Sequence, residues 1–293
     1  MKKLLLVALL FTAITSSNVM AQLNPLSASY YQNQYLANPA MAGINQGLNI
    51  NLAYRDQWSS IPGTPSSQAI TGDYGFNKVG VGVNLFNDKS GLQRWTRVVG
   101  TYAYHLKLNN DQHQLHFGVS LGFSSERLDN EMINGSTNDI LIDAYNRRGT
   151  YVDGDFGLAY TSGKLTVQSA LPNLKHLFKD NDPASMADRS TYFAAASYKL
   201  RLGNAADGTG LEPKVVMRGI KGLDDILDAG ANLTFINNKL NLMAIYHTTK
   251  SGTFGVGMQY QWLNINAAYT TETSALRRDT NGTFEINLRI STF

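Results

Sequence analysis

The sequence has no cysteine, little charge and, beyond its start, no long apolar run. Without cysteine, structural disulfides, thiolate metal sites and lipid attachment at an N-terminal cysteine are excluded. Charged residues make up only 16% of the 293 residues, and the net charge of +3 is scattered, without the basic stripe that nucleic-acid binding needs. Because no later segment is long enough for a membrane helix, the chain can cross a membrane only with the strands of a closed sheet.

The first 21 residues have the pattern of a secretory signal peptide. A positively charged start and the short apolar stretch 4–14 precede a small-x-small cleavage site at Val19-Met20-Ala21. We therefore expect an exported protein whose mature chain begins at Gln22. An uncleaved N-terminal anchor is the alternative.

Apolar residues alternate with small or polar residues along most of the remaining chain. The pattern is clearest in 113–124, HQLHFGVSLGFS, where the odd positions from Leu115 to Phe123 are apolar and the even positions are not. A polar face that recurs in strand after strand predicts an all-β fold, a transmembrane antiparallel β-barrel of about 14 strands over residues 47–293. The predicted strands are 47–55, 68–76, 78–86, 95–107, 113–124, 151–161, 164–172, 190–202, 211–218, 226–236, 239–249, 253–261, 262–271 and 282–292.

The predicted connections fall into two alternating sets. Short periplasmic turns and long outer loops are typical of outer-membrane barrels, and 26 glycines and 15 tyrosines suit tight turns and aromatic girdles. We therefore expect the protein in the outer membrane, surrounded by its lipid. The short links are 75–77, 109–112, 162–163, 203–210, 237–238 and 261–262, and the mostly longer ones are 57–67, 87–94, 126–150, 172–189 and 272–281.

The segment 22–46 lies between the predicted signal peptide and the first strand. It is rich in Asn, Gln, Tyr and Ala, and Asn38-Pro39 interrupts any regular element. We interpret it as a plug or a segment that lines the barrel wall. A flexible periplasmic tail remains an open alternative.

Several stretches of the chain carry a resemblance to a known protein family. They are SYYQNQYLANPAMAG at 29–43, YRDQWSSIPG at 54–63, NDKSG at 87–91, YAYHLKL and LHFGVSLGF within 102–123, and LEPKVVMR at 211–218. These stretches resemble the PorP/SprF family, outer-membrane proteins of the type IX secretion and gliding-motility system in Gram-negative bacteria. The resemblance covers nearly the whole expected mature chain, and the YR-x-QW-x-x-IPG and NP-A-x-AG elements are its most specific parts.

The resemblance implies a non-enzymatic barrel that works with the secretion machinery. Such proteins are associated with delivering or anchoring at the cell surface a cargo protein with a C-terminal sorting domain, often an adhesin. The family offers motif positions and no catalytic residues. The motif residues are Asn38, Pro39, Tyr54, Arg55, Gln57, Trp58, Pro62 and Gly63.

The motif residues also have a physical interpretation. Arg55 stands at one of the alternate positions of its strand whose side chains are expected to face the lumen. There its cation can anchor the N-terminal segment or pair with a lumen carboxylate. Trp58 follows at the strand end, where an amphipathic aromatic side chain suits the membrane interface. Pro62-Gly63 favours a turn in the first outer loop.

No catalytic, cofactor or metal site is predicted. His113 and His116 are three residues apart on one strand and so face opposite sides, which argues against a shared metal. The other histidines have no carboxylate cluster at ligand spacing, and no serine stands in a nucleophile elbow. Asp153 and Asp155 lie on the same, inward side of their strand, and we expect lumen-facing charges that are solvated or paired with Arg or Lys from neighbouring strands.

The predicted loop 126–150 is the best candidate for a partner contact, with 172–189 as the second. Loop 126–150 carries more apolar residues than a solvated loop requires. These residues are equally compatible with a loop that folds inward as a plug of the lumen. The alternative function is a passive channel or hydrophobic-compound transporter, to which a lumen lined by asparagines such as Asn49 and Asn266 is suited. The candidate partner residues are Met132, Ile133, Ile140, Leu141, Ile142 and Tyr145.

Overall fold

The computed structural model describes residues 29–61, 63–108, 112–129, 145–146, 149–175, 191–202, 209–220, 224–271 and 280–292. The predicted signal peptide, residues 1–21, lies outside them. Three short helical pieces come first: α2 (Ser29–Gln32), η1 (Gln34–Leu36) and η2 (Pro39–Met41). The strands are β1 (Gly47–Gln57), β2 (Ser66–Phe76), β3 (Val79–Ser90), β4 (Gln93–Leu108), β5 (His113–Leu128), β6 (Thr150–Ser162), β7 (Leu165–Leu171), β8 (Thr191–Tyr198), β9 (Leu200–Arg201), β10 (Gly210–Ile220), β11 (Ile226–Phe235), β12 (Leu240–His247), β13 (Ser251–Tyr260), β14 (Leu263–Thr270) and β15 (Thr283–Ser291).

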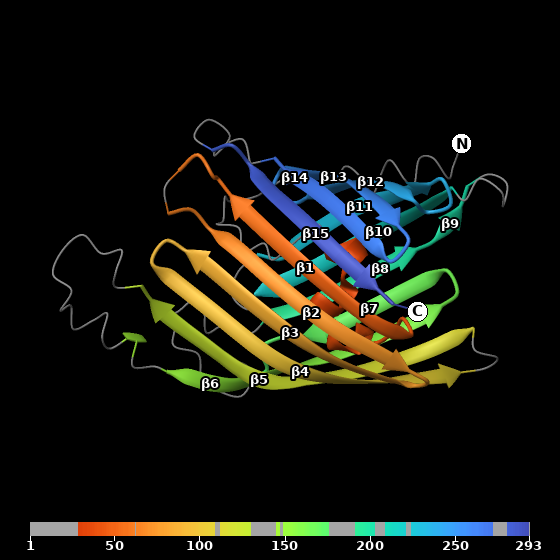
Figure 1. The fold of residues 1–293 in the computed structure, drawn as a ribbon, viewed down its shortest axis with the longest axis horizontal. Coiled ribbons are helices and arrows are strands. Elements are labelled where there is room, and N and C mark those ends of the chain that lie inside the picture. Colours follow the sequence, from red (N-terminus) through yellow and green to blue (C-terminus); the bar gives the residue numbers. More distant parts are fainter. Residues whose placement is uncertain are drawn as a thin grey trace.

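The strands form one closed antiparallel barrel (Figure 1). β1 pairs with both β2 and β15, and β11 pairs with both β10 and β12, so the described strands close into a ring. β8 and β9 both pair with β10 and occupy one position in the wall. The described strands therefore make a fourteen-position barrel, and the predicted fold is confirmed.

The wall is apolar on its outer face and polar on its inner face. Burial follows a period of two along β1, where Leu52 and Tyr54 are exposed and Asn51 and Arg55 are buried. Leu121 in β5 is 68% exposed, as expected of a side chain that faces lipid in a transmembrane barrel. The alternation predicted for 113–124, in β5, is confirmed.

Exposed aromatic side chains form two girdles, as in outer-membrane barrels. One lies near the end of the barrel with the long links and the other near the end with the short turns. The first includes Tyr54, Phe123, Tyr246, Phe254 and Phe284, and the second includes Tyr74, Phe76, Tyr198, Tyr260 and Trp262.

The prediction of a loop at 87–94 is wrong, because most of these residues lie in strands. β3 continues to Ser90 and β4 begins at Gln93, so that Gly91 and Leu92 alone form the turn. The sequence NDKS is polar on both parities and shows no alternation, yet its backbone pairs in register with β4. For the same reason β5 extends to Leu128.

Residues 29–46, called the inner segment below, lie within the ring of strands (Figure 1). Asn33 and Asn38 cap the two 3₁₀ pieces, each accepting a hydrogen bond from a backbone N–H. Pro39 follows at the first helical position, where a missing N–H costs nothing. Within the described residues, no helix is long and apolar enough to span a membrane.

Candidate functional site: the inner segment and its seat in the lumen

A band of small residues crosses six neighbouring strands on the inner wall, from β2 to β7. Its members are direct partners in the strand register, so they form one continuous row across the sheet. Because glycine and alanine project little beyond the backbone, the row leaves a shallow trough in the wall. This small-residue band consists of Gly75, Gly80, Ala103, Gly118, Gly157 and Ala170, all of them buried.

The inner segment lies in this trough with its backbone against the wall. A Cβ atom added to Gly118 would lie 2.2 Å from the Ala40 nitrogen, and one added to Gly157 would lie 2.0 Å from Asn38 Oδ1. Asn38 Nδ2 also donates to the Leu158 carbonyl at 3.0 Å. The Asn-Pro-Ala motif is therefore seated where only glycine leaves room for it.

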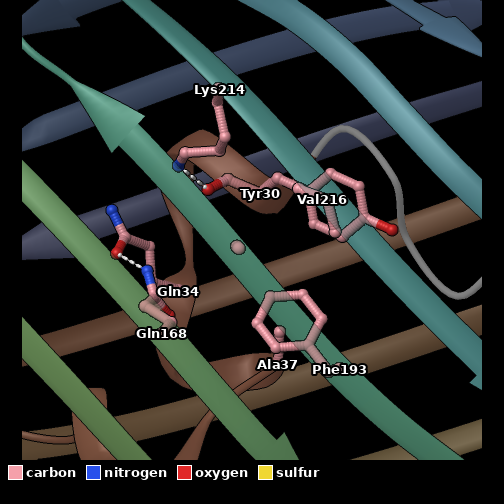
Figure 2. A pocket seen from close by; sticks show the side chains of 8 residues that line it. Tyr30, Gln34, Ala37, Gln168, Phe193, Lys214 and Val216 are labelled. Carbon is pink, nitrogen blue, oxygen red and sulfur yellow. Dashed lines mark hydrogen bonds between the residues drawn. The ribbon is translucent and has the colours of Figure 1, made fainter.

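Two cations, the buried Lys214 and the half-buried Arg289, hold the other half of the inner segment through its backbone carbonyls. Lys214 Nζ on β10 donates to the Tyr30 carbonyl at 2.5 Å (Figure 2), and Arg289 on β15 donates to the Gln32 carbonyl at 3.2 Å. Gln168 on β7 donates to the Gln34 side chain at 2.6 Å, also drawn in Figure 2. Contacts with β7, β10 and β15 thus hold the segment from several sides of the ring.

Two tyrosines of the inner segment donate hydrogen bonds to the wall. Tyr30 donates to Asp228 Oδ2 at 3.2 Å and Tyr35 donates to Thr101 Oγ1 at 2.7 Å. Burial raises the pKa of both phenols, since the charged form would lose its hydration. Both side chains therefore remain protonated donors.

Asp228 is the centre of a buried polar cluster under Tyr30. Its carboxylate accepts from Arg218 at 3.0 Å and lies 2.6 Å from His247 Nδ1, and His247 Nε2 lies 2.7 Å from Thr253 Oγ1. A carboxylate, an imidazole and a hydroxyl in line resemble the relay of a hydrolase. However, His247 and Thr253 are fully buried, and Arg218 and Tyr30 occupy the remaining carboxylate oxygen. The cluster therefore serves to anchor Tyr30.

This cluster was not predicted from the sequence. Asp228 and His247 are direct partners in the register of β11 and β12. The signal in the sequence was that both residues stand at lumen-facing positions of two strands joined by a tight turn. This signal predicts a contact only once the register of the hairpin is known.

The two carboxylates expected to face the lumen share one cation. Arg97 on β4 lies 2.6 Å from Asp155 Oδ1 and 3.6 Å from Asp153 Oδ2, and all three side chains are buried. Both are therefore lumen-facing, as predicted, and both are paired, but their partner comes from two strands away and not from a neighbouring strand.

A pair of buried histidines supports the end of the inner segment. His105 and His116 are register partners whose Nδ1 atoms are 2.8 Å apart, and His105 Nε2 lies 3.1 Å from the Ala42 carbonyl. Because a carbonyl only accepts, neutral His105 donates from Nε2 and receives the Nδ1 hydrogen of His116. His113 bonds Tyr160 instead, at 2.6 Å. Among the described residues, no group of three His, Asp or Glu is placed to hold a metal.

Comparison with known proteins identifies the family. Residues 19–290 match the family model described as "Type IX secretion system membrane protein PorP/SprF". The chain belongs to the PorP/SprF family. The resemblance inferred from the sequence motifs is thereby confirmed, and the protein is a non-enzymatic outer-membrane barrel of the type IX secretion system family. No curated protein matches the chain.

Solved structures similar to this PorP/SprF chain are outer-membrane barrels of low sequence identity. The outer membrane protein Omp33 of Acinetobacter baumannii shares 9% identity with a TM-score of 0.49, over 85% of this chain and 100% of that one. A variant of the Rh. blastica porin shares 11% identity with a TM-score of 0.36, over 84% and 99%.

The remaining PorP/SprF motif residues lie where β1 ends. Arg55 is buried and faces Glu285 across the β1–β15 register, whereas Tyr54 is exposed on the lipid side. Gln57 is buried, and the Trp58 backbone N–H donates to the Gly282 carbonyl at 2.9 Å. The Gly63 carbonyl accepts a hydrogen bond from the backbone N–H of Gly91, in the β3–β4 turn. Pro62, the remaining motif residue, lies outside the described residues.

Only part of the candidate partner loop is described. Tyr145 donates to Glu126 at 3.2 Å and accepts from Gln93 at 3.3 Å, so the end of the loop packs on the extended β4 and β5 strands. The other candidates, Met132, Ile133, Ile140, Leu141 and Ile142, lie outside the described residues.

Proposed function

We propose that this PorP/SprF barrel binds a secreted cargo protein with a C-terminal sorting domain and delivers or anchors it at the cell surface. It does so together with the type IX secretion machinery. Family membership supports the association with secretion, and the arrangement of the lumen supports binding over passage of solutes.

The observation that carries the proposal is the inner segment across the lumen. Ser29 donates to Asn287 on β15 at 2.9 Å, while Asn38 bonds β6, six positions away around the ring of fourteen. Two cavities beside the segment have volumes of about 10 and 50 Å³. Since one water needs about 10–15 Å³, these cavities suit one or a few waters and no larger solute.

With the described lumen occupied, the outer end of the barrel becomes the surface for partner binding. Loops at this end tolerate sequence variation at little cost to the barrel and can therefore be adapted to one cargo. The root of loop 126–150 is fixed, because Asn146 bonds both the N–H and the carbonyl of Leu128, at 2.7 and 3.1 Å. A loop held at its base on a rigid hairpin is suited to presenting a binding surface.

The test is a pull-down from native outer membranes in mild detergent. The tag is inserted at Asn237-Asn238, in a turn where both residues have positive φ and which lies at the opposite end from loop 126–150. We expect recovery of a large surface protein with a C-terminal sorting domain. Deletion of residues 130–144 should reduce that recovery, whereas deletion of residues 204–207, in a link at the short-turn end, should not.

The controls distinguish loss of binding from loss of the barrel. Each variant must run as a folded, heat-modifiable barrel on electrophoresis. Recovery of the barrel alone, from cells that secrete such cargo, would contradict the proposal and favour the channel or transporter.

A further inference from the structure

The outer ends of β3, β4 and β5 extend beyond the apolar belt. β4 and β5 have 16 residues each, whereas about 9–11 tilted residues suffice to cross the membrane. These strands lie side by side at the end of the barrel that carries the long links (Figure 1). Their lipid-facing side chains beyond the belt therefore lie at the level of the outer headgroups.

On this lipid-facing side, three successive cross-strand rows change from apolar to neutral polar to cationic. Each row joins direct register partners on β3, β4 and β5, so the order is a property of the sheet and not of one strand. The same order of chemistry occurs across a membrane interface, from hydrocarbon through glycerol and sugar groups to phosphate. From the belt outward, the rows are Leu85, Val98 and Phe123; Asn87, Thr96 and Ser125; and Lys89, Arg94 and Arg127.

Among the residues that the structure describes, the protein neutralises only one cation of this row. Like charges directly opposite one another on neighbouring strands repel, so Lys89, Arg94 and Arg127 would destabilise this row without an anion. Arg94 pairs with Asp129 at 2.8 Å. Within the part of the chain that the structure describes, Lys89 and Arg127 have no hydrogen-bond or ion-pair partner. Asp56 lies in the same row but is separated from Lys89 by Ser66 of β2.

We propose that Lys89, Arg94 and Arg127 form a binding site for the phosphate group of a lipid in the outer leaflet. Arginine binds phosphate through paired N–H groups, and lysine contributes a mobile point charge. The cations lie two rows, roughly 13 Å along the tilted strands, beyond the last apolar row. Their long side chains can bend back toward the membrane. This position favours a lipid phosphate over free phosphate as the ligand.

The site would fix the rotation and height of one side of the barrel in the membrane. It lies directly below the β3–β4 turn and the root of loop 126–150, so a bound lipid would also orient that loop. The proposal does not depend on the cargo, because it rests on the register, the charges and the position of the belt.

The test is native mass spectrometry of the full-length mature protein in detergent. The probes are bis-phosphorylated lipid A, the same lipid after removal of its phosphates, and sodium phosphate as a competitor. Removing a cation near an anionic surface weakens binding about fivefold at low salt, so Lys89→Ser/Arg127→Ser should weaken lipid A binding about 30-fold. The dephosphorylated lipid should bind the unaltered protein about as weakly as lipid A binds the double serine variant.

Two matched variants control for charge and folding. Lys89→Arg/Arg127→Lys keeps both charges and should bind within a fewfold of the unaltered protein. Lys239→Ser removes a cation from a turn at the opposite end and should not change binding. Equal binding by the double serine variant, or equal binding of the dephosphorylated lipid, would overturn the proposal. Full competition by sodium phosphate would overturn the assignment to lipid.

Discussion

Gly118 and Gly157 show how single residues decide what the lumen contains. Both lie in the small-residue band, and a side chain at either position would collide with the Asn-Pro-Ala turn of the inner segment. At this scale the wall is shaped by the absence of side chains. The wall and the segment therefore have to match residue by residue.

We expect Gly118→Ala to displace part of the inner segment, because the added methyl group would lie 2.2 Å from backbone atoms. Chymotrypsin should then cleave faster at Tyr30, Tyr31 or Tyr35, as followed by mass spectrometry. Gly72→Ala is the matched control, since an added Cβ there meets nothing within 4 Å. Equal cleavage rates in the two variants would show that the band does not seat the segment.

The Asp228 cluster gives a second expectation for single residues. Tyr30→Phe removes one hydrogen bond and should lower the free energy of unfolding by about 1 kcal/mol. Asp228→Ala leaves Arg218 and His247 without their carboxylate and should cost about 3–5 kcal/mol. The measurement is guanidinium unfolding in lipid vesicles. Tyr246→Phe, at an exposed lipid-facing phenol, should be neutral, and a loss as large as that of Tyr30→Phe would contradict the assignment.

Side-chain direction could be predicted from sequence, but side-chain partners could not. The parity of Arg55, Asp153 and Asp155 follows from alternation within one strand. The contact of Tyr30 with Asp228 joins residues 198 apart and depends on where the inner segment lies in the closed ring. No local pattern contains that information.

At the scale of strands, alternation predicted the elements well where one face contacts lipid. Residues 113–124 are a clear case, since every second side chain must be apolar. The ends of β3 and β4 were missed because beyond the belt both faces meet water, and the constraint that produces alternation is absent. Hydrogen bonding continues there without any sequence signature.

The orientation of β5 can be tested with a charge on its outer face. We expect Val119→Arg to lower the free energy of unfolding in lipid by about 2–4 kcal/mol, because Val119 is the central lipid-facing residue of β5 and the charge would lie near the middle of the bilayer. Ser125→Arg has the same parity but lies beyond the apolar belt, and should cost about 0–1 kcal/mol. The two variants are compared by guanidinium titration in vesicles. A similar cost for both would contradict the position of the belt.

At the scale of the whole molecule, the barrel is a scaffold whose lumen is crossed by its own N-terminal segment. The sequence predicted the closed barrel and left the role of residues 22–46 open between a plug, a wall lining and a tail. Composition cannot distinguish these, because the same tyrosines and asparagines are compatible with burial and with water. The residues that receive the segment are distributed over nine or more strands, from β2 to β15.

The central claim is that this PorP/SprF barrel acts by binding a partner and not by conducting solutes, and planar-bilayer conductance tests it most directly. The unaltered protein should give no steady open-pore current. A variant lacking residues 29–46, shown to fold by heat-modifiable electrophoresis, should conduct, because the polar lumen would then be vacant. A steady current from the unaltered protein would contradict the account and support a channel.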